Sequence, residues 1–285
     1  MEAKPERIAK RMSALGLCSR RDAERWIEEG RVAVNGKKVT TPATLVTPED
    51  VLSIDGKEIE AAEKTPEVRM WKYHKPAGLV TTHKDEKGRD TVFDHLPQEL
   101  PRVVSVGRLD LNSEGLLLLT TSGELSRALE LPKNAMARVY RARVGGELTR
   151  EQLQQIGRGL TVEGVRYQPI RIAAERGRTE GRNRWYELTL SEGKNREIRK
   201  IFMHFGIPVS RLIRVRYGKF ELGKLVPGQV EKIPQWQVDL LMKRLMGAGA
   251  PGGEDAPATA PPRFADARGS PIRLRKDKPK HGTDA

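Results

Sequence analysis

The chain has 285 residues, and its 52 Lys and Arg against 38 Asp and Glu give a formal net charge of +14. A charge of this sign and size indicates a polyanionic partner, which is RNA, DNA or an anionic membrane surface. No apolar run is long enough to cross a bilayer, and the first residues, MEAKPERIAKRM, lack the apolar core of a signal peptide. We therefore exclude a transmembrane protein and expect a cytoplasmic one.

Cysteine and histidine usage argues against a disulfide framework and against a metal site. Cys18 is the single cysteine, which excludes an internal disulfide and indicates a reducing compartment. The five histidines are spread without the spacing of metal ligands. They are His74, His83, His95, His204 and His281. We expect no bound metal.

Residues 1–62 have the pattern of a compact module that begins with two short helices. Ser19, with Asp22 three residues later, is a capping pattern for the second helix, and Gly30 is typical of a left-handed stop. Apolar residues repeat at helical spacing in both segments. They are Ile8, Met12 and Leu15 in the first helix and Ala23, Trp26 and Ile27 in the second.

A β-hairpin is expected after these helices. Val32 and Val34 alternate with less apolar residues, and Asn35-Gly36 is the dipeptide that best accommodates the positive φ angles of a tight turn. The run GLCSRRDAERWIEEGRVAVNGKKV, with the later segment 50–56, resembles the S4 RNA-binding domain. The resemblance implies that this module binds structured RNA.

Three arginines gather around the first turns of the second helix. They are Arg20, Arg21 and Arg25. A run of charge on a helix is usually a solvated face, but beside an S4-like module this cluster favours contact with RNA phosphates.

A second unit is expected at residues 68–245, after a polar linker at 61–67. Short β-like runs outnumber helices there. They lie at 103–106, 116–120, 139–144, 185–190 and 211–217. We predict an α+β fold with a mixed, mainly antiparallel sheet and flanking helices. Residues 246–285 are rich in Pro, Gly and Ala with a basic end, which predicts a disordered tail that adds salt-sensitive attraction to RNA.

The most informative stretch is GRLDLNSEGLLLLTTSGEL, residues 107–125. It places Asp110 in a polar loop between two strands, where a side chain can project into a cleft. An isolated Asp in a loop is more often a turn former than a catalyst. However, GRLD followed by S-x-GLLL-x-T and GEL resembles the signature of pseudouridine synthases. With the S4-like front end, the match covers about residues 5–240 and is similar to the branch that modifies ribosomal RNA at single sites.

The resemblance implies roles for four residues. Asp110 corresponds to the catalytic carboxylate, and Arg108 to a residue that fills the gap left by a flipped uridine. Tyr140 corresponds to the aromatic residue that packs on the target base, although the strand pattern alone indicates a core residue. Arg199 corresponds to the basic residue that pairs with the catalytic carboxylate. Such a guanidinium would lower the pKa of Asp110 and keep it ionised.

The segment SEGKNREIRKIFMHFG, residues 191–206, predicts a polar loop followed by an amphipathic helix that ends at Gly206. Its apolar stripe consists of Ile198, Ile201, Phe202 and Phe205. Lys194, Arg196 and Lys200 are expected to bind RNA phosphates.

Uridine and pseudouridine are isomers, so the implied reaction requires no cofactor, donor or water. The basic tail and the helix motif look more like enzymes acting on 23S than on 16S ribosomal RNA, and 16S is the alternative. The expected partner is that RNA, or a ribosome assembly intermediate that contains it, bound by a monomer.

Two rival functions remain open at this point. The first is an RNA-binding factor without catalysis, which would not depend on Asp110. The second is a glycoside or nucleoside hydrolase, which would need a second acid, and Glu114 is the nearest candidate. Residues 218–224, GKFELGK, have the outline of a P-loop, but Leu225 stands where Ser or Thr would hold magnesium, so we predict a turn.

Overall fold

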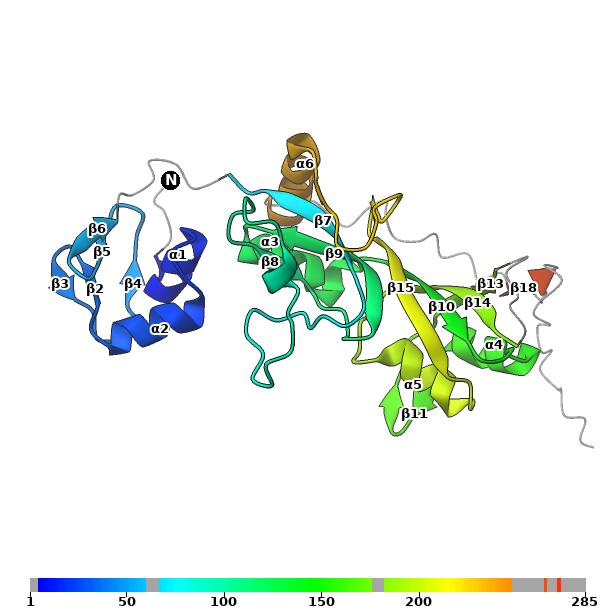
Figure 1. Cartoon of the computed structure of the whole chain (residues 1–285). Helices are drawn as coiled ribbons and strands as arrows, with labels where there is room; N and C mark the ends of the chain where they lie inside the picture. The colour runs from blue at the N-terminus through cyan, green and yellow to red at the C-terminus, as the bar shows by residue number, and fades with distance from the viewer. Residues whose placement is uncertain (1–4, 60–66, 176–181, 248–263, 266–270, 273–285) are drawn as a thin grey trace, which may run out of the picture.

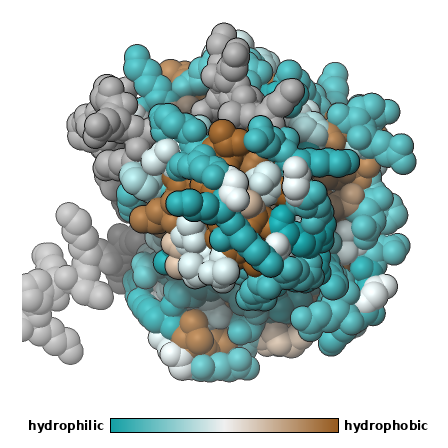
Figure 2. Space-filling model, turned by 90° about the vertical axis from the view of Figure 1, so that its left-hand side faces the viewer, coloured by the Kyte–Doolittle hydropathy of each residue, from teal (hydrophilic) through white to brown (hydrophobic). Residues whose placement is uncertain are grey.

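The computed structural model describes residues 5–59, 67–175 and 182–247, together with the backbone of 264–265 and 271–272. Most of the expected linker and nearly all of the expected tail lie outside these residues. Within the described part of the chain, no helix is long and apolar enough to cross a membrane. Figure 2 shows one end of the molecule, where hydrophilic side chains cover most of the surface and smaller apolar areas lie between them.

The N-terminal module packs two helices against a small antiparallel sheet with the strand order β3-β2-β5-β6 (Figure 1). A separate two-stranded pair, β1 with β4, lies beside the first helix. The elements are β1 (Glu6–Arg7), α1 (Ile8–Ala14), α2 (Arg20–Glu28), β2 (Val32–Val34), β3 (Lys37–Lys38), β4 (Leu45–Val46), β5 (Leu52–Ile54) and β6 (Lys57–Ile59). Both predicted helices are therefore confirmed.

The local signals of this module act as their chemistry predicts. The Ser19 hydroxyl accepts a 3.0 Å hydrogen bond from the backbone N–H of Asp22 and so caps α2. Gly30 has a φ of 69°, as expected for a helix stop. Asn35 and Gly36 have φ angles of 49° and 75° and connect β2 to β3 as the predicted hairpin.

The second unit is built on one nine-stranded sheet whose main path runs β13-β14-β10-β15-β9-β7-β17. Two short strands extend it, because β8 pairs with β9 and β16 with β15. The strands are β7 (Met70–Lys75), β8 (Val104–Val106), β9 (Ser113–Thr120), β10 (Arg138–Val144), β13 (Arg171–Ala174), β14 (Arg184–Leu190), β15 (Val209–Tyr217), β16 (Phe220–Glu221) and β17 (Val230–Lys232). Each of the five predicted β runs falls on one of these strands.

One pairing in this sheet is parallel, between β15 and β9, and the other strand pairs on the path are antiparallel. A mixed, mainly antiparallel sheet is what the sequence predicts. The P-loop outline at 218–224 is a hairpin turn, in which Tyr217 pairs with Phe220.

The run Leu116–Leu119 is buried because β9 is covered on both faces. Leu116 and Leu118 belong to one cluster, which packs under α3 and α6. Leu117 and Leu119 point the other way into a second cluster, since successive side chains of a strand alternate between faces. We call this second group the loop-side cluster. It consists of Trp71, Tyr73, Leu79, Val92, Val103, Leu109, Leu117 and Leu119.

A third group of buried residues, the helix-side cluster, packs α4 and α5 against the strands β10, β13, β14 and β15. The helices of this unit are α3 (Gly123–Glu130), α4 (Arg150–Arg158), α5 (Glu197–His204) and α6 (Gln235–Met246). The remaining short elements are η1 (Phe93–His95), η2 (Pro132–Asn134), β11 (Thr161–Val162), β12 (Val165–Arg166), β18 (Phe264–Ala265) and β19 (Pro271–Ile272). The predicted stripe of α5 is buried at Ile198, Ile201 and Phe202.

Candidate active site

Tyr140 is a half-buried residue of β10 at the border between the loop-side and helix-side clusters, and it packs against both. Leu109 belongs to the loop-side cluster and directly precedes Asp110. Ile198 belongs to the helix-side cluster and follows Arg196 by two positions. Tyr140 therefore lies between the cluster that contains Leu109 and the cluster that contains Ile198.

The loop that carries Asp110 is held by side chains on its backbone. The Thr81 hydroxyl donates a 2.9 Å hydrogen bond to the carbonyl oxygen of Leu109 and accepts one of 3.3 Å from the Leu109 N–H. The backbone N–H of Gly107 donates to the carboxylate of Glu130 at 2.9 Å. These three bonds fix the residues that precede Asp110.

Lys75 fixes the residues that follow Asp110. Its side chain is fully buried at the end of β7. The ammonium donates to the carbonyl oxygens of Pro76, Leu111 and Ser113, at 2.9, 3.3 and 2.9 Å. Burial lowers the pKa of Lys75 to about 8, against the opposing attraction of Asp110 and Glu114. The Asp110 loop is thus connected to a buried cation.

Arg196 provides the cation nearest to Asp110. Its Nη1 lies 3.8 Å from Oδ2 of Asp110, whose side chain is 30% exposed. The carboxylate is therefore accessible from solvent and adjacent to a guanidinium. Arg196 has a left-handed backbone, with φ of 52°, at the residue that precedes α5.

The expected pairing of Arg199 with Asp110 differs from the structure. Arg199 lies one turn into α5, where its half-buried guanidinium donates to the carbonyl oxygens of Val209 and Asn112 at 2.8 and 2.9 Å. Burial, followed by the nearby Arg196, lowers its pKa, and Asp110 opposes that shift. Arg199 thus attaches α5 to β15 and to the Asp110 loop, while Arg196 forms the ion pair.

Glu114 is held as an ionised carboxylate. Arg211 donates two hydrogen bonds of 2.8 Å to it, one to each carboxylate oxygen. This bond from Arg211 is the main reason that the pKa of Glu114 lies below its usual range. A carboxylate that remains ionised and already accepts both Arg211 hydrogens is unsuited to the general acid of a hydrolase.

The other predicted contact residues lie on the surface. Arg108 is exposed two residues before Asp110, and Lys194 is exposed in the loop before α5. Lys200 is half-buried on α5. In the N-terminal module Arg20 and Arg21 are exposed, and Arg25 is exposed but paired with Asp22 and Glu29.

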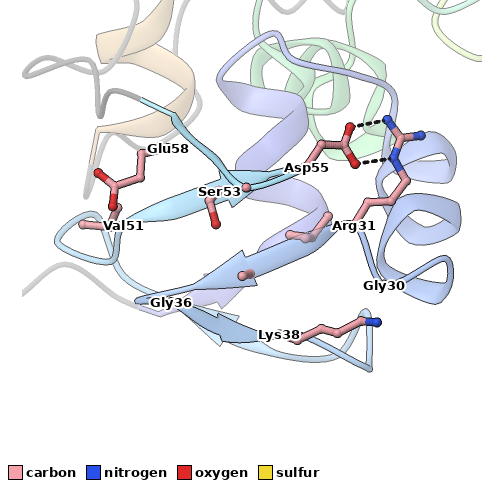
Figure 3. Close-up of a pocket in the computed structure, with 11 residues that line it drawn as sticks. Gly30, Arg31, Gly36, Lys38, Val51, Ser53, Asp55 and Glu58 are labelled. Atoms are coloured by element: carbon pink, nitrogen blue, oxygen red, sulfur yellow. Dashed lines mark hydrogen bonds and ion pairs between the residues drawn. The ribbon is translucent and has the colours of Figure 1, made fainter.

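A hollow in the N-terminal module has a different character. It lies over the sheet strands, and Figure 3 shows Arg31 and Asp55 at its edge, joined by two hydrogen bonds of 2.9 and 2.7 Å. Its lining contains no residue of the Asp110 loop or of α5. Among the described residues there is also no group of three or more His, Cys, Asp or Glu side chains arranged to hold a metal ion.

Comparisons with known proteins identify the family of this chain. Residues 6–52 match the model of the S4 domain, and residues 69–204 match the model of RNA pseudouridylate synthase. An RNA pseudouridine synthase of Rickettsia felis, itself uncharacterized, is 47% identical over 228 residues, which is 80% of this chain and 96% of that protein. The chain belongs to the RNA pseudouridine synthases. Its predicted membership and its predicted S4 domain are both confirmed.

Two further relatives of this synthase are named ribosomal large subunit pseudouridine synthase B. The protein of Pseudomonas aeruginosa is 40% identical, over 84% of this chain and 62% of its own length. That of Salmonella typhi is 41% identical, over 78% of this chain and 77% of its own length. A solved pseudouridylate synthase crystal structure shares the fold, with a TM-score of 0.57 and 23% identity, over 82% of this chain and 99% of the other.

Sequence reasoning missed several residues that hold the synthase site. Lys75, Thr81 and Glu130 all act on backbone groups of the Asp110 loop. The one signal in the sequence is at Lys75, a charged residue that ends the run MWKYHK directly before a proline. No local pattern in the sequence distinguishes Thr81 or Glu130 from surface residues.

Proposed function

We propose that this enzyme converts one specific uridine of 23S ribosomal RNA to pseudouridine, with Asp110 as the catalytic carboxylate. The observation that carries the proposal is the position of Asp110: an accessible carboxylate on a loop held from several sides, with Arg196 at 3.8 Å. Preorganised charge of this kind stabilises a transition state without further rearrangement. The substrate follows from the relatives named for the large ribosomal subunit.

The reaction breaks the N-glycosidic bond, rotates the uracil and joins its carbon 5 to the sugar. A single ionised carboxylate serves this reaction by attacking the sugar, by adding to the base or by removing a sugar proton. In each route the detached uracil must be kept and water excluded, since water would turn the reaction into hydrolysis. The buried clusters beneath Asp110 and beside Tyr140 provide an apolar floor for that purpose.

The proposed substrate contacts are those that the family resemblance implies. The flipped uracil stacks on Tyr140, a contact worth about 1 to 3 kcal/mol for a base on an aromatic ring. Arg108 fills the place that the base has left in the RNA. Arg196 and Asp110 face each other at the site, and Arg199 acts through the backbone of Asn112. RNA phosphates bind Lys194 and Lys200 and the S4 arginines Arg20, Arg21 and Arg25.

The deciding experiment compares wild type with Asp110→Asn on unmodified 23S and 16S ribosomal RNA. Pseudouridine is mapped by chemical-adduct primer extension, and RNA binding is measured in parallel. We expect one new pseudouridine, in 23S RNA alone, that is absent with Asp110→Asn although binding persists. A new pseudouridine in 16S RNA instead would show that 16S, and not 23S, ribosomal RNA is the substrate. Full activity of Asp110→Asn would remove Asp110 from the chemistry.

A further inference from the structure

The loop of residues 191–196 before α5 is held by a buried carboxyl group. Glu197, the first residue of α5, is only 4% exposed. One of its oxygens, Oε2, accepts a 3.1 Å hydrogen bond from the backbone N–H of Lys194. The other, Oε1, is buried and has no hydrogen-bond partner. A buried oxygen without a partner costs free energy unless it carries a proton that it can donate.

A second carboxyl group lies next to it. Glu192 accepts a 2.7 Å hydrogen bond from the backbone N–H of Gln168, and its other oxygen pairs with the Lys194 ammonium. The side chains of Glu192 and Glu197 also interact directly with each other. Two adjacent carboxyl groups of which one is buried cannot both ionise cheaply, so the pair retains one proton.

The environments of the two groups decide which one holds it. Burial, followed by the charge of Glu192, raises the pKa of Glu197 to about 8. Burial acts in the same direction on Glu192, but the N–H of Gln168 and the ammonium of Lys194 outweigh it and hold its pKa below the usual range. Pairs whose environments push the two values apart have defined acid and base members.

We propose that Glu197 is protonated in the active enzyme, donates its proton to Glu192, and thereby positions the loop whose residues Lys194 and Arg196 meet the RNA and Asp110. The proposal rests on the proposed function, because it assigns RNA contact to that loop. Glu197 is a positioning residue. Its carboxyl group is buried beneath the loop, and it influences Arg196 only by holding the loop backbone. The left-handed backbone of Arg196 directly precedes it.

Within the described part of the chain, three further charged or titratable groups lie around the carboxyl pair, namely Lys194, Tyr167 and Glu163. The Nζ of Lys194 lies 5.6 Å from the centre of the Tyr167 ring. Lys194 faces the carboxyl pair from the loop before α5, and Tyr167 faces it from the segment after β12. Glu163, in the turn between β11 and β12, faces Tyr167. Lys194 can neutralise one carboxylate of the pair but not two. Loss of the shared proton therefore places an uncompensated charge under the loop and disrupts its position.

The experiment measures affinity for unmodified 23S ribosomal RNA at pH 7 and pH 9 for the full chain, for Glu197→Gln, and for a control, Glu187→Gln, on the exposed surface of β14. A glutamine at 197 donates to Glu192 as the protonated acid does, but it cannot ionise. Between pH 7 and pH 9, the RNA affinity of wild type and of the control should fall. This fall should be about tenfold larger than the fall in Glu197→Gln, as linkage to a group with a pKa of about 8 requires. An equal fall in all three proteins overturns the proposal.

A second measurement does not depend on RNA or on activity. In the full wild-type chain labelled with ¹³C-glutamate, the carboxyl carbon of Glu197 is assigned through its backbone and followed from pH 4 to pH 10. Titration near pH 8 is expected, and titration in the usual range of exposed glutamate, about pH 4 to 5, overturns the proposal even if Glu197→Gln does not fold. Absence of pseudouridine in any RNA would refute the proposed function and leave this titration readable.

Discussion

Lys75 Nζ donates a 2.9 Å hydrogen bond to the carbonyl oxygen of Ser113, so the last residue of β7 is bonded to the first residue of β9 through a buried cation. Asp110 lies three residues before Ser113, and its carbonyl oxygen accepts the Ser113 N–H at 3.0 Å. Both backbone groups of Ser113 are therefore used: its carbonyl oxygen binds Lys75, and its N–H binds the loop that carries the proposed catalytic carboxylate.

Lys75→Met is expected to lower both stability and turnover. The methionine keeps the length of the side chain but removes the ammonium donor from three carbonyl oxygens, of which that of Leu111 still accepts the Gly78 N–H, and this should cost about 2 to 3 kcal/mol of unfolding free energy. Turnover should fall more than RNA affinity, because the loop of Asp110 loosens while the surface cations remain. Urea unfolding and single-turnover pseudouridine formation test this. Lys72→Met, on the same strand, removes a surface pair with Glu231 and should cost less than about 1 kcal/mol. Equal effects of the two substitutions would contradict the role given to Lys75.

Arg196 and Arg199 should respond differently to replacement by lysine. At 3.8 Å from Asp110, Arg196 acts through its charge, so Arg196→Met should reduce turnover about tenfold or more and Arg196→Lys should recover much of it. Arg199 donates to Val209 and Asn112 with two separate Nη groups, and a lysine cannot occupy both directions. Arg199→Lys should therefore be nearly as impaired as Arg199→Met. Recovery with lysine at 199 but not at 196 would reverse the two roles.

Gly115→Ala should be strongly destabilising. Gly115 has a φ of 102°, and an added Cβ would lie 2.3 Å from the backbone oxygen of Arg214 on the neighbouring strand β15. Because the obstacle is backbone, the strands must separate, and we expect a loss of about 3 kcal/mol or more. Gly123→Ala is the control, since Gly123 begins α3 with no heavy atom within 4 Å of the added Cβ. Thermal unfolding of the two variants should differ clearly, and similar melting temperatures would contradict the close approach.

Stability should depend on pH through Glu197. Its pKa rises from an ordinary 4.5 to about 8 on folding, so the folded state binds the proton more tightly. The stabilisation is complete below about pH 4.5 and is lost as the pH rises through about 8, on the order of a few kcal/mol. Urea unfolding between pH 5 and pH 9 should show this decline in wild type and a smaller one in Glu197→Gln. Lys75 acts in the opposite sense, because its lowered pKa adds stability as the pH rises above about 8. A wild-type curve that rises between pH 5 and pH 8 would refute the Glu197 assignment.

Local chemistry explains which parts of the fold were predictable. Ser19 caps a helix and Asn35-Gly36 turns a hairpin through groups a few residues away, so the sequence contains the whole interaction. Lys75 donates to the carbonyl oxygen of Ser113, 38 residues away, and Glu130 accepts from the N–H of Gly107, 23 residues away. No local sequence pattern predicts either partner.

The site residues divide in the same way. The position of Asp110 in a loop between two strands was predictable from its motif, while its catalytic role remains a proposal. The residue that pairs with Asp110 was not predictable. Helical spacing shows which side of α5 Arg199 occupies, but it does not show that the residue before the helix, Arg196, has a left-handed backbone and lies beside the carboxylate. The direction of a side chain at a helix entrance depends on the preceding loop, and here that loop is held by Glu192 and by the buried Glu197, whose contacts are tertiary.

The parallel pairing of β15 with β9 has a consequence for how the enzyme is made. Ser113, Glu114 and Gly115, just after Asp110, are paired with Leu212, Ile213 and Arg214, about a hundred residues further along the chain. Contacts between such distant segments form late, since the loop between them must be ordered first. During synthesis, the ribosome must therefore release most of the catalytic unit before Asp110 and the start of α5 can meet. A nascent chain that ends before β15 contains every residue of the GRLD motif but lacks the strand with which Ser113, Glu114 and Gly115 pair.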